Sequence, residues 1–372
     1  MYTIKTISSF WNSLQYKFFP MLEEFLPPLL ESHYEVIAIL EMVQIEKFLA
    51  HYPTGWKGRP PTSRIALARA FVAKHILNIL TNEQLRERIL CDKSLRMICG
   101  WERYNQVPSS STFSRTFDMF SRLRLPEVVH EILVMRMYKN EVVGHLSRDS
   151  TDIPAREKSK KKSEKKRAFP IRGGPRKKGE GKCEQQLSQD LEEMLKDIST
   201  DCDFGSKVSS KGHRLNWIGY KLHADVADRS IPISCKLTSA SVADPIMAIP
   251  LSTISGRRVT SFYELMDKAY YVKAIEQFIE SRGRRALIIK CAKSTQAKED
   301  QAEELKARTV INWQPAETVR QKHRTEVERF FSQLKDNFSG RMIRFQGHRK
   351  VFCHLMFGIL ALTASQLLRL IT

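Results

Sequence analysis

The sequence predicts a mixed α/β protein in which an all-helical N-terminal domain precedes a five-stranded mixed sheet flanked by helices. Three observations predict this fold class. The chain has 372 residues, enough for two domains of which one buries a full α/β core. Apolar residues recur at helical spacing as far as about residue 140. Beyond that point, short apolar runs of strand type alternate with helical segments, as in a sheet covered by helices.

The N-terminal domain is expected to span residues 1–140. Apolar side chains are dense over residues 36–43, and residues 65–80 have the spacing of a long amphipathic helix. Thr81 and Gln84 stand three positions apart, as the two members of a capping box do, and predict that a new helix begins here. This region is therefore predicted to be helical throughout.

A helix is predicted over residues 112–123, after a short Ser-rich turn. Its phenylalanines fall at i, i+4 and i+7 and form one apolar stripe: Phe113, Phe117 and Phe120. Arg115 and Arg122 fall elsewhere on its surface. Two interpretations stay open. The helix is either the second half of a helix-turn-helix, with these arginines turned to DNA, or a bundle helix whose phenylalanines are simply core.

Five strands and three helices are predicted after residue 140. The strands are the segments 142–149, 217–226, 231–237, 262–266 and 286–289. The helices are the segments 244–254, 272–279 and 325–338. Their order fits a mixed sheet with helices on its faces, so the second domain is expected to span residues 141–372.

The most apolar stretch of the chain is at its C-terminal end. Residues 351–370 are about as long as a membrane span, but they include His354, Gln366 and Arg369. A buried C-terminal packing helix is therefore expected, with no membrane association. The seven cysteines include no C-x-x-C pair, which is typical of a reducing compartment, and no signal peptide is apparent. A cytoplasmic protein is expected.

Positive charge is concentrated in one tract. The net charge is +20, which favours a polyanionic partner such as nucleic acid. Residues 156–182 hold thirteen Lys or Arg against three Glu. Six of these cations are clustered near its centre: Lys160, Lys161, Lys162, Lys165, Lys166 and Arg167. We interpret the tract as a basic loop that binds DNA phosphates, with a solvated linker as the alternative.

Two aspartates, Asp149 and Asp267, stand where a predicted strand stops. A carboxylate there is held rigidly by the sheet and stays open to solvent, which is how α/β folds place catalytic groups. Asp152 is a rival for the first position. Positions 149 and 152 face opposite sides of a strand, so only one of them can serve one site. The expected strand end favours Asp149.

The late helix over residues 325–338 supplies a third carboxylate. Arg324, Glu328 and Lys335 share one stripe of this helix. The other side is apolar and expected to be buried: Val327, Phe330, Phe331, Leu334 and Phe338. Glu328 is therefore expected to lie at the edge of the core between two cations, whereas Glu326 points away from that stripe.

Three converging carboxylates repel one another unless cations bind between them. Oxygen ligands alone suit Mg²⁺ or Mn²⁺, and two such ions about 3.5–4 Å apart assist both the attacking and the leaving oxygen in phosphodiester chemistry. Asp149, Asp267 and Glu328 are therefore predicted to be catalytic residues and metal ligands, with two such ions as cofactors. Arg324 and Lys335 are predicted to bind DNA phosphates.

In this order, the motifs resemble those of bacterial insertion-sequence transposases with a DDE site. Asp149-Ser-Thr is similar to the first catalytic motif of that family, and Met266-Asp267-Lys-Ala-Tyr270 to the second. Arg324-x3-Glu328-x6-Lys335 is similar to the third. The stretches 219–223 and 237–244 are also similar, and the resemblance covers about residues 50–370. The chain departs from the family pattern at Gln321, where Tyr is frequent, and at Ala269, where Gly is common.

The resemblance implies a ribonuclease-H-like catalytic domain behind an N-terminal helical DNA-binding domain. It implies an enzyme that cleaves transposon ends and joins them to target DNA. The implied partners are double-stranded DNA, as terminal inverted repeats and target, and a second copy of the chain in a homodimeric complex. The implied location is the bacterial cytoplasm, in association with the nucleoid.

Two other functions stay open. A domesticated or decayed transposase would bind DNA without cutting it, although retention of all three carboxylates argues against decay. A related metal-dependent nuclease would hydrolyse DNA without joining it.

Overall fold

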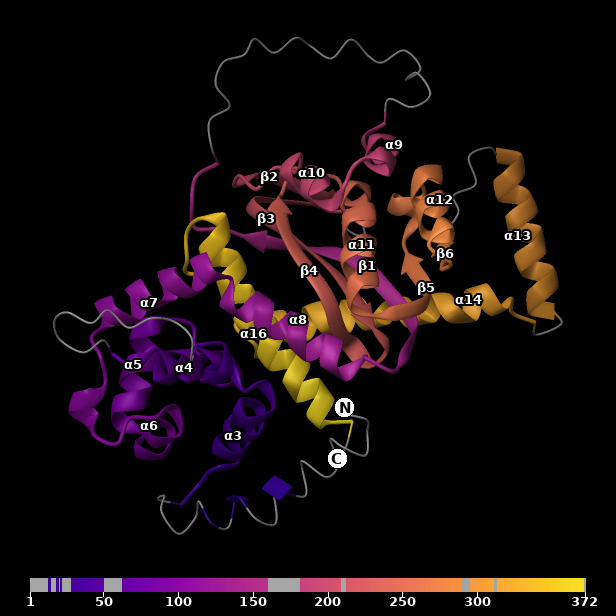
Figure 1. Ribbon diagram of the computed structural model, residues 1–372. Helices are drawn as coiled ribbons and strands as arrows, with labels where there is room; N and C mark the ends of the chain where they lie inside the picture. Colours follow the sequence, from indigo (N-terminus) through magenta and orange to yellow (C-terminus); the bar gives the residue numbers. More distant parts are fainter. Residues whose placement is uncertain are drawn as a thin grey trace. The chain divides into compact units, whose positions relative to one another are not determined.

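The computed structural model describes residues 28–49, 62–159, 181–208, 212–289, 295–310 and 313–370, with five further residues before residue 22. The chain forms two compact units, coloured along the sequence in Figure 1. We call the first the helical unit, which consists of Met1–Asn140, Ile153–Glu157 and Phe331–Thr372. We call the second the sheet unit, which consists of Glu141–Asp152 and Lys158–Phe330.

The helical unit is built around the C-terminal helix. Its main helices are α3 (Glu31–Val43), α4 (Arg64–Ile76), α5 (Asn82–Cys91), α6 (Lys93–Cys99), α7 (Ser110–Leu123), α8 (Leu125–Met137) and α16 (His348–Leu368). Helix α16 packs against α3, α4, α7 and α8. A segment from the end of the chain therefore packs among helices that all lie before residue 138.

Local sequence signals begin these helices. The capping box predicted before α5 is confirmed. The Gln84 amide donates to Thr81 Oγ1 over 3.1 Å, and the Thr81 amide donates to Gln84 Oε1 over 3.2 Å. Ser63 accepts from the Ala66 amide at the start of α4. Each cap satisfies an amide that has no partner within its own helix.

The phenylalanine stripe of α7 is core. Phe113, Phe117 and Phe120 are buried, as the bundle interpretation requires. The ring of Phe71 in α4 lies 6.0, 5.2 and 6.1 Å from their respective ring centroids. The arrangement leaves Arg115 and Arg122 exposed on the outer side of the same helix.

Helix α16 has the length and composition of a membrane span, and among the described residues it alone passes that test. However, 94% of its most apolar window is buried inside the protein. The predicted C-terminal packing helix is therefore confirmed as a core helix.

The sheet unit contains a mixed sheet of six strands. They are β1 (Val142–Pro154), β2 (Asp203–Val208), β3 (Arg214–Ala227), β4 (Ile231–Ser239), β5 (Thr260–Met266) and β6 (Arg285–Ile288). The order is β2-β3-β1-β5-β6, with β4 also paired to β3. Strands β1, β5 and β6 are parallel, whereas β2 and β4 run antiparallel to β3.

The predicted mixed sheet is confirmed, but the expected number of five strands is wrong by one. Strand β2 was missed because its exposed side chains include Phe204 and Val208, so its sequence lacks the alternation of a half-buried strand.

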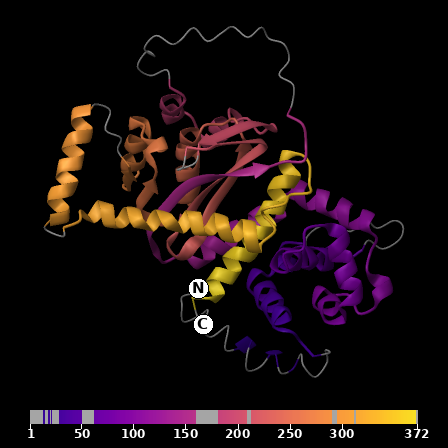
Figure 2. The ribbon, with the colours of Figure 1, turned by 180° about the vertical axis from the view of Figure 1, so that it is seen from behind.

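Helices cover both faces of this sheet (Figures 1 and 2). On one face, α11 (Ala248–Arg258) packs on β3 and β4, and α12 (Lys273–Ser281) packs on β6. The other face is crossed by α14 (Ala316–Gln321), η8 (Lys322–Arg324) and the first part of α15 (Thr325–Asn337). The Ser147 hydroxyl of β1 donates to the His323 carbonyl over 2.9 Å. The remaining helices of the unit are α9 (Lys182–Gln185), α10 (Leu191–Lys196) and α13 (Thr295–Val310).

A buried ion network ties the centre of the sheet to α11. Arg148 of β1 binds Asp225 of β3 and Glu264 of β5, with closest distances of 2.7 and 2.9 Å. Arg284 also binds Glu264, and the Ser252 hydroxyl of α11 donates to the Glu264 carboxylate over 2.8 Å. Because each carboxylate has a cationic partner, these charges are tolerated inside the sheet unit.

Strand β1 is longer than predicted. The prediction that it stops at Asp149 is wrong, because it continues to Pro154. Its last residues, from Ile153 on, belong to the helical unit, where Ile153 is buried. Asp149 thus lies inside a strand whose pairing with β5 ends at Ser147.

The two compact units also differ from the two consecutive domains that the sequence predicted. The chain first enters the sheet unit at Glu141, where the second domain was expected to begin. It returns to the helical unit for Ile153–Glu157 and again for Phe331–Thr372.

Candidate active site

Two parallel strands bring Asp149 and Asp267 to neighbouring positions. In the pairing of β1 with β5, Ser147 lies opposite Leu265. Two residues further along the same register, Asp149 stands beside Asp267, which directly follows the last residue of β5. The Asp267 carboxylate accepts a hydrogen bond from the Ala269 amide over 2.9 Å and caps η7 (Lys268–Tyr270). This bond fixes the orientation of the carboxylate at the strand end.

The environment of Asp149 disfavours its charge. Burial raises the pKa of Asp149, and the nearby carboxylate of Asp267 raises it further. A hydrogen bond from the Ser150 amide and the positive charges of Lys207 and Arg324 act in the opposite direction without cancelling the shift. A carboxylate whose ionisation is opposed in this way would be stabilised by a bound cation.

Arg324 joins the strand aspartate to the helix glutamate. Its Nη1 lies 3.7 Å from Asp149 Oδ2, and its Nη2 lies 3.0 Å from Glu328 Oε1. The Glu328 side chain is 53% exposed, so it is open to a ligand. The apolar side of α15 is buried as predicted. Burial of that side fixes the rotation of the helix and therefore the direction in which Glu328 points.

Glu326 takes a different direction, as expected from its place on the helix. The Ser230 hydroxyl donates to Glu326 Oε2 over 2.6 Å, and Arg329 binds Oε1 at 2.8 Å. Its carboxylate is therefore engaged away from Asp149.

Helix α14 is attached to the sheet through Gln321, one of the two residues at which the chain departs from the family pattern. The Gln321 side-chain amide donates to the carbonyl of Leu287 in β6. Gln321 thus attaches the segment that leads into Arg324 to strand β6.

The other predicted DNA contacts are dispersed. Lys335 follows Glu328 by two turns in α15 but belongs to the helical unit. In α7, Arg122 pairs with Asp118 at 2.8 Å, and Arg115 donates to the Ser111 carbonyl. Six residues of the basic tract lie outside the described residues: Lys160, Lys161, Lys162, Lys165, Lys166 and Arg167.

Asp152, the rival of Asp149, lies three positions further along β1 and half-buried. The ion pair with Arg324 and the electrostatic interaction with Asp267 both involve Asp149. These contacts favour Asp149 as the member of the site.

A fourth carboxylate, Asp244, lies in the same neighbourhood. Its Oδ1 accepts from the Ser150 hydroxyl over 2.8 Å and pairs with Lys221 Nζ at 3.0 Å. Burial opposes its ionisation, but the charges of His223 and Lys221 and these hydrogen bonds outweigh burial and hold the pKa of Asp244 below its usual value. Asp244 was predicted only to begin the helix 244–254 and to end the second of the two similar stretches between Asp149 and Asp267.

Tyr270 lies behind the carboxylates. It is buried, and burial together with the charges of Asp244, Asp149 and Asp267 raises its pKa well above the ordinary value, with Arg148 acting against the shift. Its hydroxyl has no hydrogen-bond partner among the described residues. Tyr270 therefore remains neutral and packs as an apolar support for the strand ends.

Lys207 is a cation near Asp149 that was not among the predicted DNA-binding residues. It is exposed on the edge strand β2, and its charge favours the ionised form of Asp149. Together with Arg324, it makes the surroundings of the carboxylates suitable for a phosphate.

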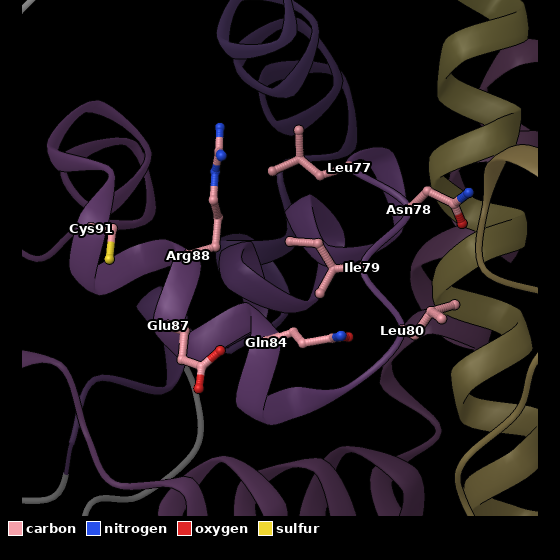
Figure 3. A pocket seen from close by; sticks show the side chains of 8 residues that line it. All are labelled: Leu77, Asn78, Ile79, Leu80, Gln84, Glu87, Arg88 and Cys91. Carbon is pink, nitrogen blue, oxygen red and sulfur yellow. The ribbon is translucent and has the colours of Figure 1, made fainter.

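A surface pocket of about 720 Å³ occurs in the helical unit (Figure 3). It is lined by the end of α4, the following loop and one side of α5: Leu77, Asn78, Ile79, Leu80, Gln84, Glu87, Arg88 and Cys91. The pocket is lined by one carboxylate, that of Glu87. It lacks the group of carboxylates that a metal-dependent site requires.

Known protein families match both parts of the chain. The family described as Transposase DDE domain matches residues 144–364, more than half of the chain, and this range contains Asp149, Asp267 and Glu328. The family described as Transposase domain (DUF772) matches residues 21–119. No curated protein and no solved structure matched the chain. The mixed sheet flanked by helices agrees with the ribonuclease-H-like fold of a DDE domain. The chain therefore belongs to the insertion-sequence transposases of the DDE family.

Proposed function

We propose that the protein is a metal-dependent DNA transposase that cleaves the ends of its element and joins them to target DNA. Asp149, Asp267 and Glu328 form its catalytic site. The observation that carries the proposal is the bridge made by Arg324, whose guanidinium lies 3.7 Å from Asp149 and 3.0 Å from Glu328. Burial and the nearby carboxylate of Asp267 raise the pKa of Asp149, and a bound cation would favour its ionised form.

The donor set fits hard divalent cations. Asp149 offers carboxylate oxygens from within β1, Asp267 from the end of β5 and Glu328 from α15. Oxygen ligands suit Mg²⁺ or Mn²⁺. Two such ions, when bound, supply the Lewis acidity that phosphodiester chemistry requires. No softer ligand is needed for this assignment.

The protein side chains divide the remaining work. Asp149 and Asp267 are rigid because the sheet holds them, while Glu328 closes the site from α15. Once the carboxylates bind cations, the Arg324 guanidinium is free to hold a DNA phosphate, for which its planar fork is suited. Lys207 adds a second positive charge near Asp149.

The reaction proceeds in two steps at this site. In cleavage, a water oxygen attacks the phosphorus at the transposon end and the 3′-oxygen leaves as a hydroxyl. In joining, that 3′-hydroxyl attacks a phosphorus of target DNA and displaces its 3′-oxygen. Each step forms one P–O bond and breaks one, so no external energy source is needed.

The partners in this proposal are double-stranded DNA and a second copy of the chain. The terminal inverted repeats and the target DNA are held by Lys335, Arg115, Arg122 and the basic tract 156–182. Two ends joined in one complex require at least a homodimer. The reaction takes place on nucleoid DNA in the bacterial cytoplasm.

The test is cleavage of linear DNA that carries the element's ends, with Mg²⁺ or Mn²⁺. Glu328→Gln should reduce cleavage at least about 1,000-fold, because a metal ligand is worth several kcal/mol of transition-state stabilisation. DNA binding in a gel shift should persist. Glu326→Gln is the matched control, with the same change two positions away on the same helix.

Cleavage by Glu328→Gln at the wild-type rate would show that the site is assigned wrongly. Wild-type protein that binds DNA but cuts none under either ion would instead point to a DNA-binding protein without catalysis. A strand-transfer assay with pre-cleaved ends separates a transposase from a nuclease, since a nuclease gives no joined product.

A further inference from the structure

A second cluster of potential metal ligands lies on the same face of β1. It consists of His145 in β1, Asp228 in η5 (Asp228–Ser230) and His323 in η8, all within the sheet unit. Asp228 Oδ1 lies 3.1 Å from His145 Nδ1 and 3.4 Å from His323 Nδ1. One ligand atom from each residue lies within 4.8 Å of the others.

The two distances from Asp228 Oδ1 are close to those between ligands of one small cation. With zinc bonds of about 2.0–2.1 Å, neighbouring ligands in a tetrahedron lie roughly 3.4 Å apart. Two imidazole nitrogens and one carboxylate oxygen suit a borderline transition metal such as Zn²⁺ or Co²⁺ better than Mg²⁺ or Ca²⁺, which prefer oxygen alone. The cluster thus differs in donor chemistry from the carboxylate site.

The carboxylate is oriented before any metal binds. The His145 backbone amide donates to Asp228 Oδ2 over 3.2 Å, which leaves Oδ1 directed at the two rings. A Cβ at Gly144 would come within 3.0 Å of the same Oδ2, so the glycine leaves room for this approach. Such outer hydrogen bonds orient ligands in known metal sites.

The rings must rearrange slightly to bind a metal together. They stack with centroids 4.2 Å apart and an interplanar angle of 11°, whereas a metal lies in the plane of each ring that binds it. His145 is held on its other side by Tyr263, at 5.6 Å between centroids. The His323 side chain is 46% exposed and stands in a short 3-10 segment, so it is the ring with freedom to turn.

We propose that His145, Asp228 and His323 form a binding site for one transition-metal ion of the Zn²⁺ class, separate from the carboxylate site. His145 precedes Asp149 by four strand residues, a distance of about 13 Å. The ion would tie η8, which ends with Arg324, to the strand that carries Asp149. The binding itself does not depend on the proposed catalytic function; only this fastening role rests on it.

The experiment measures binding of Co²⁺ and Zn²⁺ to the purified full chain after chelation. Co²⁺ reports nitrogen ligands and tetrahedral geometry through its visible absorption, and Zn²⁺ then displaces it. The double variant Asp149→Asn/Glu328→Gln removes the carboxylate site and should retain one ion per chain. His323→Ala should weaken binding more than about 100-fold, since even the outer partners of metal ligands are worth roughly 10–100-fold. His213 is exposed and directly precedes β3. His213→Ala is therefore the matched control and should bind the ion as wild type does.

Asp228→Asn serves as a second test at a different element and should also lose the ion. Circular dichroism establishes whether each variant is folded. Equal binding by wild type and His323→Ala would overturn the proposal. So would binding that disappears only in the carboxylate double variant, or wild-type protein that binds neither ion. These measurements detect metal binding and not DNA cleavage. Failure of the proposed catalytic site, which is tested by cleavage, can therefore be distinguished from failure of this metal site.

Discussion

The guanidinium of Arg148 donates two hydrogen bonds of 2.7 Å to the carboxylate of Asp225, and both side chains are almost completely buried. Arg148 directly precedes Asp149 in β1, so the two side chains point to opposite faces of the sheet. The buried face anchors the strand to β3, β5 and α11, while the other face carries the proposed catalytic aspartate. The position of Asp149 therefore depends on a buried charge network on the opposite face of the strand.

Replacing Arg148 by Met should destabilise the sheet unit by about 3–5 kcal/mol, because the change leaves Asp225 buried without its guanidinium. Glu264 would keep its other partner, Arg284. The free energy of unfolding, from denaturant titration, is the measurement. Arg122→Met is the control, since that side chain is 67% exposed and its loss should cost little. Equal effects of the two changes would contradict a special role for the buried network.

The choice between the two aspartates of β1 can be tested by matched amides. Asp149→Asn should reduce end cleavage at least about 1,000-fold, as expected for a lost metal ligand. Asp152→Asn should keep most of the activity, because the interactions with Arg324 and Asp267 belong to Asp149. Initial rates under Mn²⁺ give the comparison. The reverse order of the two variants would assign the site to Asp152.

The prediction of Asp267 and Glu328 from the sequence depended on local signals. The apolar run of β5 ends at Met266, so the next residue is at a strand end. The buried phenylalanines of α15 set the rotation of this helix about its axis. That rotation determines the direction of Glu328 and can be inferred from the local sequence. Both signals are contained in fewer than twenty consecutive residues, which is why they could be read from the chain alone.

Other features depend on residues far apart in the chain. Asp244 is held in place by Lys221 and Ser150, and the His145 cluster assembles from three distant segments. The periodicity of apolar residues in the sequence does not predict contacts between segments that are far apart in the chain. The end of β1 was also misplaced, because the last residues of this strand, from Ile153 on, belong to the helical unit and not to the sheet unit. The same holds for α16, whose apolar sequence predicts burial but not the partner that buries it.

Arg324 is expected to affect both rate and pH dependence. Arg324→Ala should lower cleavage by about 100–1,000-fold, the usual effect of losing a group that stabilises transition-state charge. Removal of its charge also raises the pKa of Asp149 further, so the acidic limb of the pH–rate profile should move to higher pH. Arg324→Lys should recover only part of the rate, since an ammonium cannot contact both carboxylates as the planar guanidinium does.

Arg329→Ala is the control for this experiment. Arg329 lies on the same helix, is 64% exposed and pairs with Glu326. Its removal should leave the pH–rate profile in place. A profile that is unchanged in Arg324→Ala would mean that Arg324 does not control the ionisation of Asp149.

Lys74 gives the helical unit a pH-dependent stability. Burial lowers the pKa of Lys74 from 10.5 to about 7, although its Nζ donates to the Leu80 carbonyl over 3.1 Å. The unfolded chain keeps its proton up to about pH 10.4, so between these two values it binds more protons than the folded chain. The free energy of unfolding should therefore increase from pH 7 to pH 10.

Lys74→Met removes this titration and should stabilise the helical unit at pH 7 by on the order of a few kcal/mol, less about 1 kcal/mol for the lost hydrogen bond. The gain should shrink as the pH approaches 10, where the wild-type lysine is neutral in the folded state. Thermal unfolding at pH 7 and pH 10, followed by circular dichroism, measures the difference. Lys93→Met, at an exposed position of α6, is the control and should show no such pH dependence. A gain of the same size at both pH values would mean that the effect comes from packing of the methionine, since the titration of Lys74 acts only below its unfolded pKa.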